Sequence, residues 1–219
     1  MKAKQMTSLL SLVLLALTIS LLTTGGCDIK FSSDNDNGNG GNNDAVLQGT
    51  ITEITPDTDI EGITVEVEDE DSGNLFSDIT DADGFFRIEG NFSGSPARLR
   101  FFDETSGPPI ASTNITVFPG AEVDMGDITI TNGIVATDVI NVIFEADIVE
   151  NNCSGDSGTL EVKVDNDTEV IVQVSSATEI ILNNDDDLIC EDLSVDDKIE
   201  IDGELMLNNI VDAERIEVL

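Results

Sequence analysis

Acidic side chains are the residues of this chain whose number and spacing offer the most chemistry. The sequence holds 45 Asp and Glu against 9 Lys and Arg, a formal net charge of −36. Asp185, Asp186 and Asp187 stand side by side, next to Asn183 and Asn184. Oxygen ligands of this kind suit Ca²⁺, which would also relieve the repulsion between the carboxylates. A run of like charges is equally typical of a solvated loop, so calcium binding and plain solvation both stay open here.

Asp81 and Asp83 form a second candidate calcium site, in the run Thr80-Asp81-Ala82-Asp83-Gly84. The same run suits a tight turn, because Asp side chains accept hydrogen bonds from nearby backbone N–H groups. Gly84 can adopt a positive φ at no steric cost. We therefore expect Asp81 and Asp83 to shape a turn, with calcium binding as the alternative.

The residues that are missing exclude several classes of function. The chain has no His, Trp or Tyr, so it cannot build a Ser-His-Asp or Cys-His nucleophile or an imidazole metal site. Phosphate is repelled by so acidic a chain, which excludes nucleic acid as a partner. Sugar-binding proteins usually expose Trp or Tyr rings, so carbohydrate binding is disfavoured. We expect a protein that is not an enzyme and needs no cofactor.

Two cysteines in the C-terminal half, Cys153 and Cys190, are candidates for a disulfide. In an exported protein a pair of this kind is typically oxidised. A catalytic thiol pair is the rival interpretation, but the two residues are far apart in sequence and form no CxxC motif.

Residues 1–26 have the order of a secretory signal peptide. Lys2 and Lys4 precede an apolar stretch from Leu9 to Leu22, and small residues follow. A membrane-spanning helix needs roughly 20 apolar residues, and this stretch is shorter. Cleavage is therefore the preferred interpretation over a retained helix.

Gly25, Gly26 and Cys27 resemble the lipobox of bacterial lipoproteins, although Thr24 stands where that family usually has Leu. The resemblance implies that Cys27 becomes the new N-terminus and carries acyl chains such as palmitate. The protein would then be exported to the bacterial cell envelope, periplasm or cell surface, with the membrane as its partner through the lipid. Ordinary cleavage that leaves Cys27 as a free thiol is the alternative.

Residues 27–44 continue as a segment rich in Ser, Asp, Asn and Gly. Such a composition buries too little apolar surface to offset chain entropy, so we expect a disordered linker. Asp34 and Asp36 hint at a calcium loop, but Asn39 and Ala45 stand where an EF-hand needs Gly and Glu. A solvated spacer is the preferred interpretation.

From residue 45 onwards, apolar and polar residues alternate with a period of two. The pattern is clear at 63–68, 127–131, 160–165 and 198–202, and it is typical of strands with one buried and one solvated face. Seven of the nine Phe residues fall between Phe76 and Phe118. Two cores of different make-up explain this distribution, so we expect an all-β chain with units at 45–131 and 132–219.

Three segments of the first unit resemble the carboxypeptidase regulatory-like domain, a transthyretin-like sandwich. They are Leu47-Gln48-Gly49-Thr50-Ile51, residues 62–67, and the run 80–88 that contains Thr-Asp-x-Asp-Gly-Phe. The resemblance implies an Ig/prealbumin-like β-sandwich over 45–131. The pilin relatives of this fold carry a Lys–Asn cross-link, which is excluded here because the unit has no Lys.

The second unit resembles an uncharacterised family of small OB-like β-barrel domains in bacterial exported proteins. The resemblance is carried by residues 193–203 and 212–217, with Asp196-Asp197 where the family typically has Gly-Asp. It implies a small β-barrel over 132–219, and no activity.

These expectations combine into one functional hypothesis. The chain is expected to be a non-enzymatic, membrane-anchored exported lipoprotein whose β modules serve structure or contact with protein partners at the cell envelope. The alternative is a calcium- or ligand-binding surface module, carbohydrate included.

Overall fold

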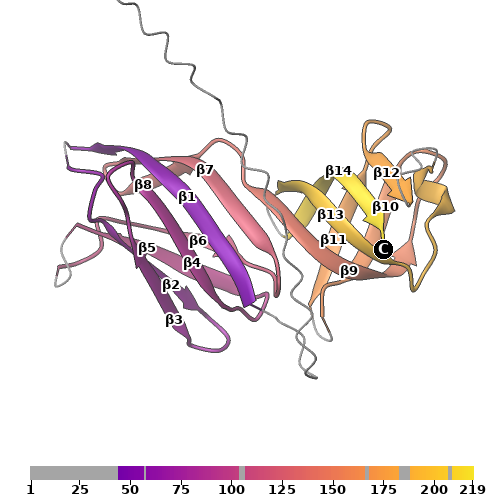
Figure 1. Cartoon of the computed structure of the whole chain (residues 1–219), viewed down its shortest axis with the longest axis horizontal. Helices are drawn as coiled ribbons and strands as arrows, with labels where there is room; N and C mark the ends of the chain where they lie inside the picture. The colour runs from indigo at the N-terminus through magenta and orange to yellow at the C-terminus, as the bar shows by residue number, and fades with distance from the viewer. Residues whose placement is uncertain (1–43, 57, 104–106, 166–167, 183–187, 207–208) are drawn as a thin grey trace, which may run out of the picture. The chain divides into compact units, whose positions relative to one another are not determined.

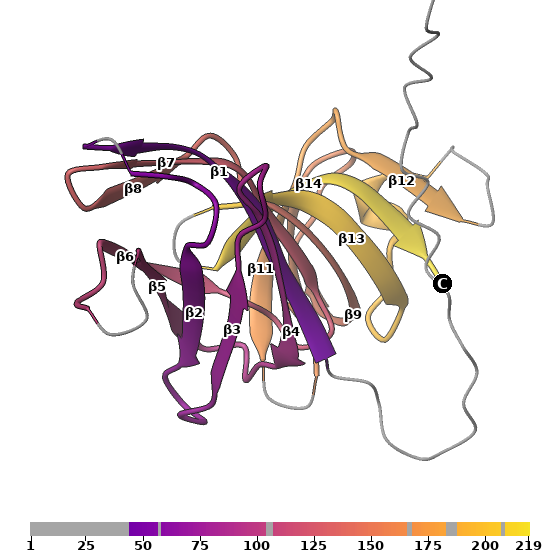
Figure 2. The ribbon, with the colours of Figure 1, turned by 60° about the vertical axis from the view of Figure 1, so that its left-hand side comes forward.

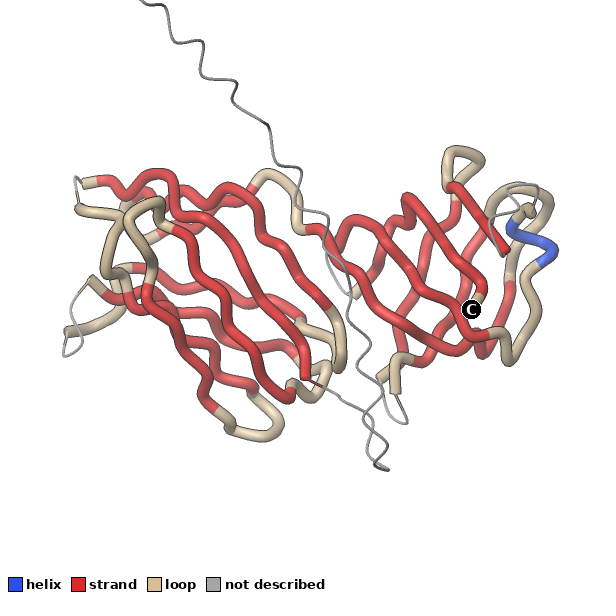
Figure 3. The backbone as a smooth tube through the Cα atoms, viewed as in Figure 1, coloured by secondary structure: helices blue, strands red, loops and turns tan. Residues whose placement is uncertain are grey.

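The computed structural model describes residues 44–56, 58–103, 107–165, 168–182, 188–206 and 209–219. Strands make up most of this part of the chain, and its only helical element is a short 3₁₀ turn, η1 (Cys190–Asp192) (Figure 3). The expected all-β class is confirmed. None of the helical structure in the described residues has the length or apolar character needed to cross a membrane.

The first eight strands form two groups (Figure 1). In one group β1 lies between β4 and β7, parallel to β7 and antiparallel to β4, and β8 pairs with β7. The other group is a separate four-stranded sheet in the order β3-β2-β5-β6. The bounds are β1 (Asp44–Thr55), β2 (Thr64–Asp69), β3 (Leu75–Ile79), β4 (Phe85–Asn91), β5 (Pro96–Phe102), β6 (Ala111–Thr116), β7 (Glu122–Thr131) and β8 (Ile134–Thr137).

Alternation along these strands directs one face of each group inward. On β2, Val65 and Val67 are fully buried, whereas Glu66 and Glu68 face outward. The ring of Phe86 on β4 meets that of Phe101 on β5 edge to face, with centroids 6.5 Å apart. Buried side chains of both groups therefore belong to one core, and Figure 2 shows β2, β3, β5 and β6 as a layer distinct from β1, β7 and β8.

The remaining strands close into a five-stranded barrel in the order β10-β11-β14-β13-β9, and a β9–β10 pairing completes the ring. The short β12 pairs with β14 outside this ring. Closure leaves the ring without a free edge, and the expected barrel is confirmed. The bounds are β9 (Asn141–Asn151), β10 (Gly158–Lys163), β11 (Glu169–Val174), β12 (Glu179–Leu182), β13 (Lys198–Leu205) and β14 (Ile210–Val218).

One long strand joins the barrel to the first eight strands. The start of β9, at Asn141–Ile143, pairs with Glu122–Asp124 of β7, so a single ten-stranded sheet runs through both parts. The rings of Phe118 and Phe144 lie 5.2 Å apart between centroids and continue the core across this join. The expected boundary at Asn132-Gly133 falls in the turn between β7 and β8, where both residues have positive φ.

Candidate functional site

The Asp81 side chain accepts hydrogen bonds within the turn between β3 and β4. Its Oδ1 accepts hydrogen bonds from the backbone N–H groups of Asp83, at 2.9 Å, and Phe85, at 3.0 Å. Gly84 has a φ of +80°, and a Cβ there would lie 2.2 Å from the carbonyl oxygen of Ile51. The turn geometry expected from the sequence is thus present, with Asp83 exposed beside it.

The other candidate calcium ligands, Asp185, Asp186 and Asp187, lie outside the described residues, as does Cys27. Within the described ranges, no group of three or more Cys, Asp or Glu side chains is arranged to hold a metal ion.

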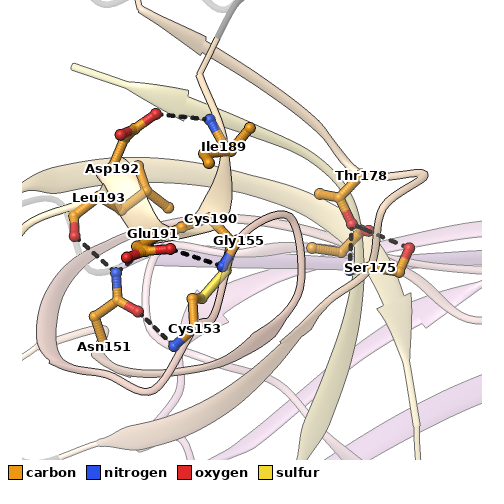
Figure 4. Close-up of a disulfide and its surroundings, with 11 residues drawn as sticks. Asn151, Cys153, Gly155, Ser175, Thr178, Ile189, Cys190, Glu191, Asp192 and Leu193 are labelled. Carbon is orange, nitrogen blue, oxygen red and sulfur yellow. Dashed lines mark hydrogen bonds between the residues drawn. A yellow bond between two sulfur atoms is a disulfide. The ribbon is translucent and has the colours of Figure 1, made fainter.

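Cys153 and Cys190 lie at disulfide distance, with Cα atoms 5.6 Å apart (Figure 4). Hydrogen bonds surround the pair: Asn151 donates through Nδ2 to the carbonyl oxygens of Cys190, at 3.0 Å, and Leu193, at 2.7 Å. The backbone N–H of Gly155 donates to the Glu191 carboxylate at 2.8 Å. The sulfur link and these bonds together fasten η1 to the segment between β9 and β10.

Asp69 is a buried carboxylate that the sequence analysis did not single out. It is fully buried and accepts four hydrogen bonds, from Asp71, Ser72 and both polar groups of Ser93. Burial raises the pKa of this carboxyl, but the hydrogen bonds from Ser72, Ser93 and Asp71 together outweigh burial and lower the pKa below its ordinary value. Asp69 stands two residues before the turn-forming run Asp71-Ser72-Gly73-Asn74, and an Asp at the start of a turn is the sequence signal that could have identified this role.

Most of the described cationic side chains pair with carboxylates on the protein surface. Arg100 lies 3.5 Å from Glu66 and 3.3 Å from Glu68, and its buried Nε has no hydrogen-bond partner. The other ion pairs are Arg87–Glu89, Arg98–Glu70, Lys198–Glu145, Arg215–Glu200 and Arg215–Glu217.

A groove of about 500 Å³ lies where β6 meets the end of β13. Its wall is held by the Thr116 hydroxyl, which donates to Asn209 Oδ1 at 2.7 Å, and by the Leu205 N–H, which donates to the carbonyl oxygen of Ile140 at 2.8 Å. The lining residues are mainly apolar or uncharged: Pro96, Asn114, Ile115, Thr116, Ile140, Glu204, Leu205, Met206 and Asn209.

A second cavity, of about 430 Å³, adjoins this groove at Glu204, which lines both. Besides Glu204, its charged lining residues are Asp212 and Glu214, and none of the described residues that line it is a cation. Sequence reasoning missed both cavities because their walls come from strands far apart in the chain, which no local pattern connects. Together they are the candidate functional site: a mainly apolar groove and an acidic pocket that share Glu204 as a lining residue.

No protein-family profile matches this chain, and no curated protein matches it.

Proposed function

We propose that this chain is an exported, lipid-anchored bacterial envelope protein whose two β modules form a non-catalytic platform for contact with other proteins. The observation that carries the proposal is the junction of the modules, where β7 pairs with β9 and a groove opens beside β6. Binding sites occur preferentially at such boundaries between modules.

The proposed anchor rests on the N-terminal sequence. Basic residues, an apolar stretch and Gly25-Gly26-Cys27 succeed one another as in lipoproteins. The strongly acidic body would be repelled by anionic headgroups. Lipid on Cys27, and not a basic patch, is thus the proposed means of attachment, with residues 28–43, which precede β1, as the spacer.

The proposed modules are a prealbumin-like sandwich of the carboxypeptidase regulatory-like type and an OB-like barrel. The buried faces of β4 and β5, which meet through Phe86 and Phe101, favour the sandwich. The buried Thr80 favours it too: its hydroxyl donates to the carbonyl oxygen of Ile60 at 2.6 Å and accepts from the N–H of Ile63 at 2.9 Å. These bonds tie the Thr-Asp-x-Asp-Gly-Phe element to the loop that precedes β2.

The polar side chains described above favour a platform over a catalyst. Asp69 accepts four hydrogen bonds and Asp81 accepts two from backbone N–H groups, and the arginines of β4 and β5 pair with neighbouring carboxylates. The groove and the acidic pocket are two surfaces that remain available in the described part of the chain.

Mass spectrometry of the mature N-terminus in a bacterial host tests the proposal. We expect cleavage before Cys27, acyl chains on that residue, and the protein in the membrane fraction. Cys27→Ala should release the protein from the membrane fraction, whereas the control Ser32→Ala should leave it there. An uncut leader on cytosolic protein, or a purified chain that turns over a substrate, would overturn the proposal.

A further inference from the structure

We propose that the groove beside β6 and the adjoining acidic pocket bind an extended segment of a partner protein, in which an apolar side chain stands close to a Lys or Arg. This inference rests on the proposed function and adds the chemistry of the partner. The apolar side chain would occupy the groove, and the cationic group would reach the pocket at Glu204.

The groove offers the partner an apolar wall. Ile140 and Leu205, which line the groove, are half-buried, and Met206 is 45% exposed. A volume of about 500 Å³ suits one or two side chains of a peptide, since ligand pockets range from roughly 300 to 1,000 Å³. An apolar side chain placed there would cover part of the exposed Met206.

The acidic pocket supplies the charge complementarity. Glu204 and Asp212 face each other in the β13–β14 register, an arrangement of like charges that is unfavourable without a counter-charge. Within the described part of the chain, neither these two side chains nor Glu214 makes a hydrogen bond or an ion pair. A Lys or Arg of the partner would provide the missing cation.

The strand next to the groove favours an extended peptide over a compact molecule. Among the described strands β6 stands at the end of its sheet and pairs with β5 alone, and Asn114, Ile115 and Thr116 of β6 line the groove. Outer strands have backbone groups that an added strand can pair with. A second copy of the chain is a poor occupant, because each copy carries a formal charge of −36.

The chain has four methionines, of which Met206 lines the groove and Met125 is buried in the core, 1% exposed. Full-length protein in zwitterionic nanodiscs, labelled with ¹³C at the methionine methyl groups, therefore has a reporter in the groove and another in the core. The probe is a short acetylated peptide that alternates Val and Lys, and the control peptide has Glu in place of each Lys. We expect the Val–Lys peptide to shift the Met206 resonance and leave that of Met125 in place.

Substitutions test the charge component of the binding. The double variant Glu204→Gln with Asp212→Asn should weaken binding of the Val–Lys peptide about three- to tenfold. The matched control Glu150→Gln removes an exposed carboxylate of β9 that lines neither cavity, and it should bind as the wild type does. Added salt should weaken binding to the wild type more than to the double variant.

Several outcomes would overturn the inference. They are an unmoved Met206 resonance, an equal shift with the Val–Glu peptide, or an unchanged affinity in the double variant. A Met206 shift that follows protein concentration without peptide would assign the groove to a second copy. The proposed function fails separately, if Cys27 carries no lipid. A lipidated protein that does not bind the Val–Lys peptide would refute this inference and leave the proposed function intact.

Discussion

Asp69 and Ser93 are joined by two hydrogen bonds that link separate turns at one end of the first module. The Ser93 N–H donates to Asp69 Oδ2 at 2.7 Å, and the Ser93 hydroxyl donates to Oδ1 at 2.9 Å. Asp71 and Ser72 donate their N–H groups to the same Oδ1. Three of the four donor groups therefore bond to Oδ1 and the Ser93 N–H bonds to Oδ2, so the arrangement needs both oxygens of a carboxylate as acceptors.

Replacing this carboxylate should destabilise the fold. Asp69→Asn keeps the size but replaces Oδ2, which accepts from the Ser93 N–H, with an amide group that cannot accept, so this part-buried N–H loses its partner. We expect a loss of roughly 2–3 kcal/mol in the free energy of unfolding, measured by urea denaturation. The control is Asp71→Asn, an exposed acid on the same turn that accepts one bond from Ser95. A loss no larger than that of the control would contradict the proposed role.

The lowered pKa of Asp69 predicts how its contribution depends on pH. Since the carboxyl binds its proton less readily in the folded state than in the unfolded chain, its contribution is present above the unfolded pKa. It is lost as the pH falls through the folded pKa, below about pH 4. The difference in unfolding free energy between wild type and Asp69→Asn should therefore be constant near neutrality and shrink in acid. A difference that grew in acid would reverse the assigned sign.

Strands and turns were the parts of the fold that local sequence could predict. The alternation at residues 63–68 and 198–202 predicted β2 and β13, because it arises from the pleat itself. Likewise Asp81 and Gly84 predicted a turn, because their roles are confined to a few neighbouring residues.

Long-range relationships could not be predicted in the same way. The pairing of β7 with β9 and the β9–β10 closure depend on register between strands, and alternation leaves register undetermined. The groove brings together residues from Pro96 to Asn209, with no shared pattern. Asp69 was missed because, in a chain of 45 acids, one more Asp before a turn is inconspicuous until its burial is known.

The Cys153–Cys190 pair should stabilise the barrel. The two residues are 37 positions apart, and closing a loop of this length restricts the unfolded chain by roughly 3–4 kcal/mol in the chain-entropy model. Reductant should lower the unfolding midpoint of the wild type by a corresponding amount. The double variant Cys153→Ala with Cys190→Ala should have the lower midpoint even without reductant, and added reductant should not change it. A wild-type midpoint that is indifferent to reductant would contradict this role.

Asp81 and Asp83 should differ sharply on substitution. Asp81→Ala removes two bonds to backbone N–H groups and should cost about 1 kcal/mol of unfolding free energy. Asp83→Ala removes an exposed side chain outside this bond set and should change it by less than about 0.5 kcal/mol. Thermal melts in EDTA and in millimolar Ca²⁺ separate the turn from a calcium site. If both variants lost equal amounts of unfolding free energy, and lost it only in the presence of Ca²⁺, metal ligation by Asp81 and Asp83 would be favoured.

A row of three carboxylates crosses the outside of the barrel. Glu200 of β13 stands opposite Glu145 of β9 and Glu217 of β14 in the strand register. Burial and the negative charge of Glu217 raise the pKa of Glu200, and the nearby Arg215 only partly offsets them. Glu145 and Asp202 add to the rise. Like charges directly opposite each other on neighbouring strands destabilise a sheet.

Glu200→Gln should therefore stabilise the protein at neutral pH, by roughly 0.3–1 kcal/mol in urea denaturation. The raised pKa means that the contribution of Glu200 is most favourable below its unfolded pKa and is lost as the pH rises through the folded pKa. The gain from the substitution should thus vanish in acid, where Glu200 is neutral in both states. The Arg215 partner, 3.9 Å away and shared with Glu217, is too distant to reverse the effect. Destabilisation by Glu200→Gln at neutral pH would mean that the ion pair with Arg215 outweighs the repulsion along the row.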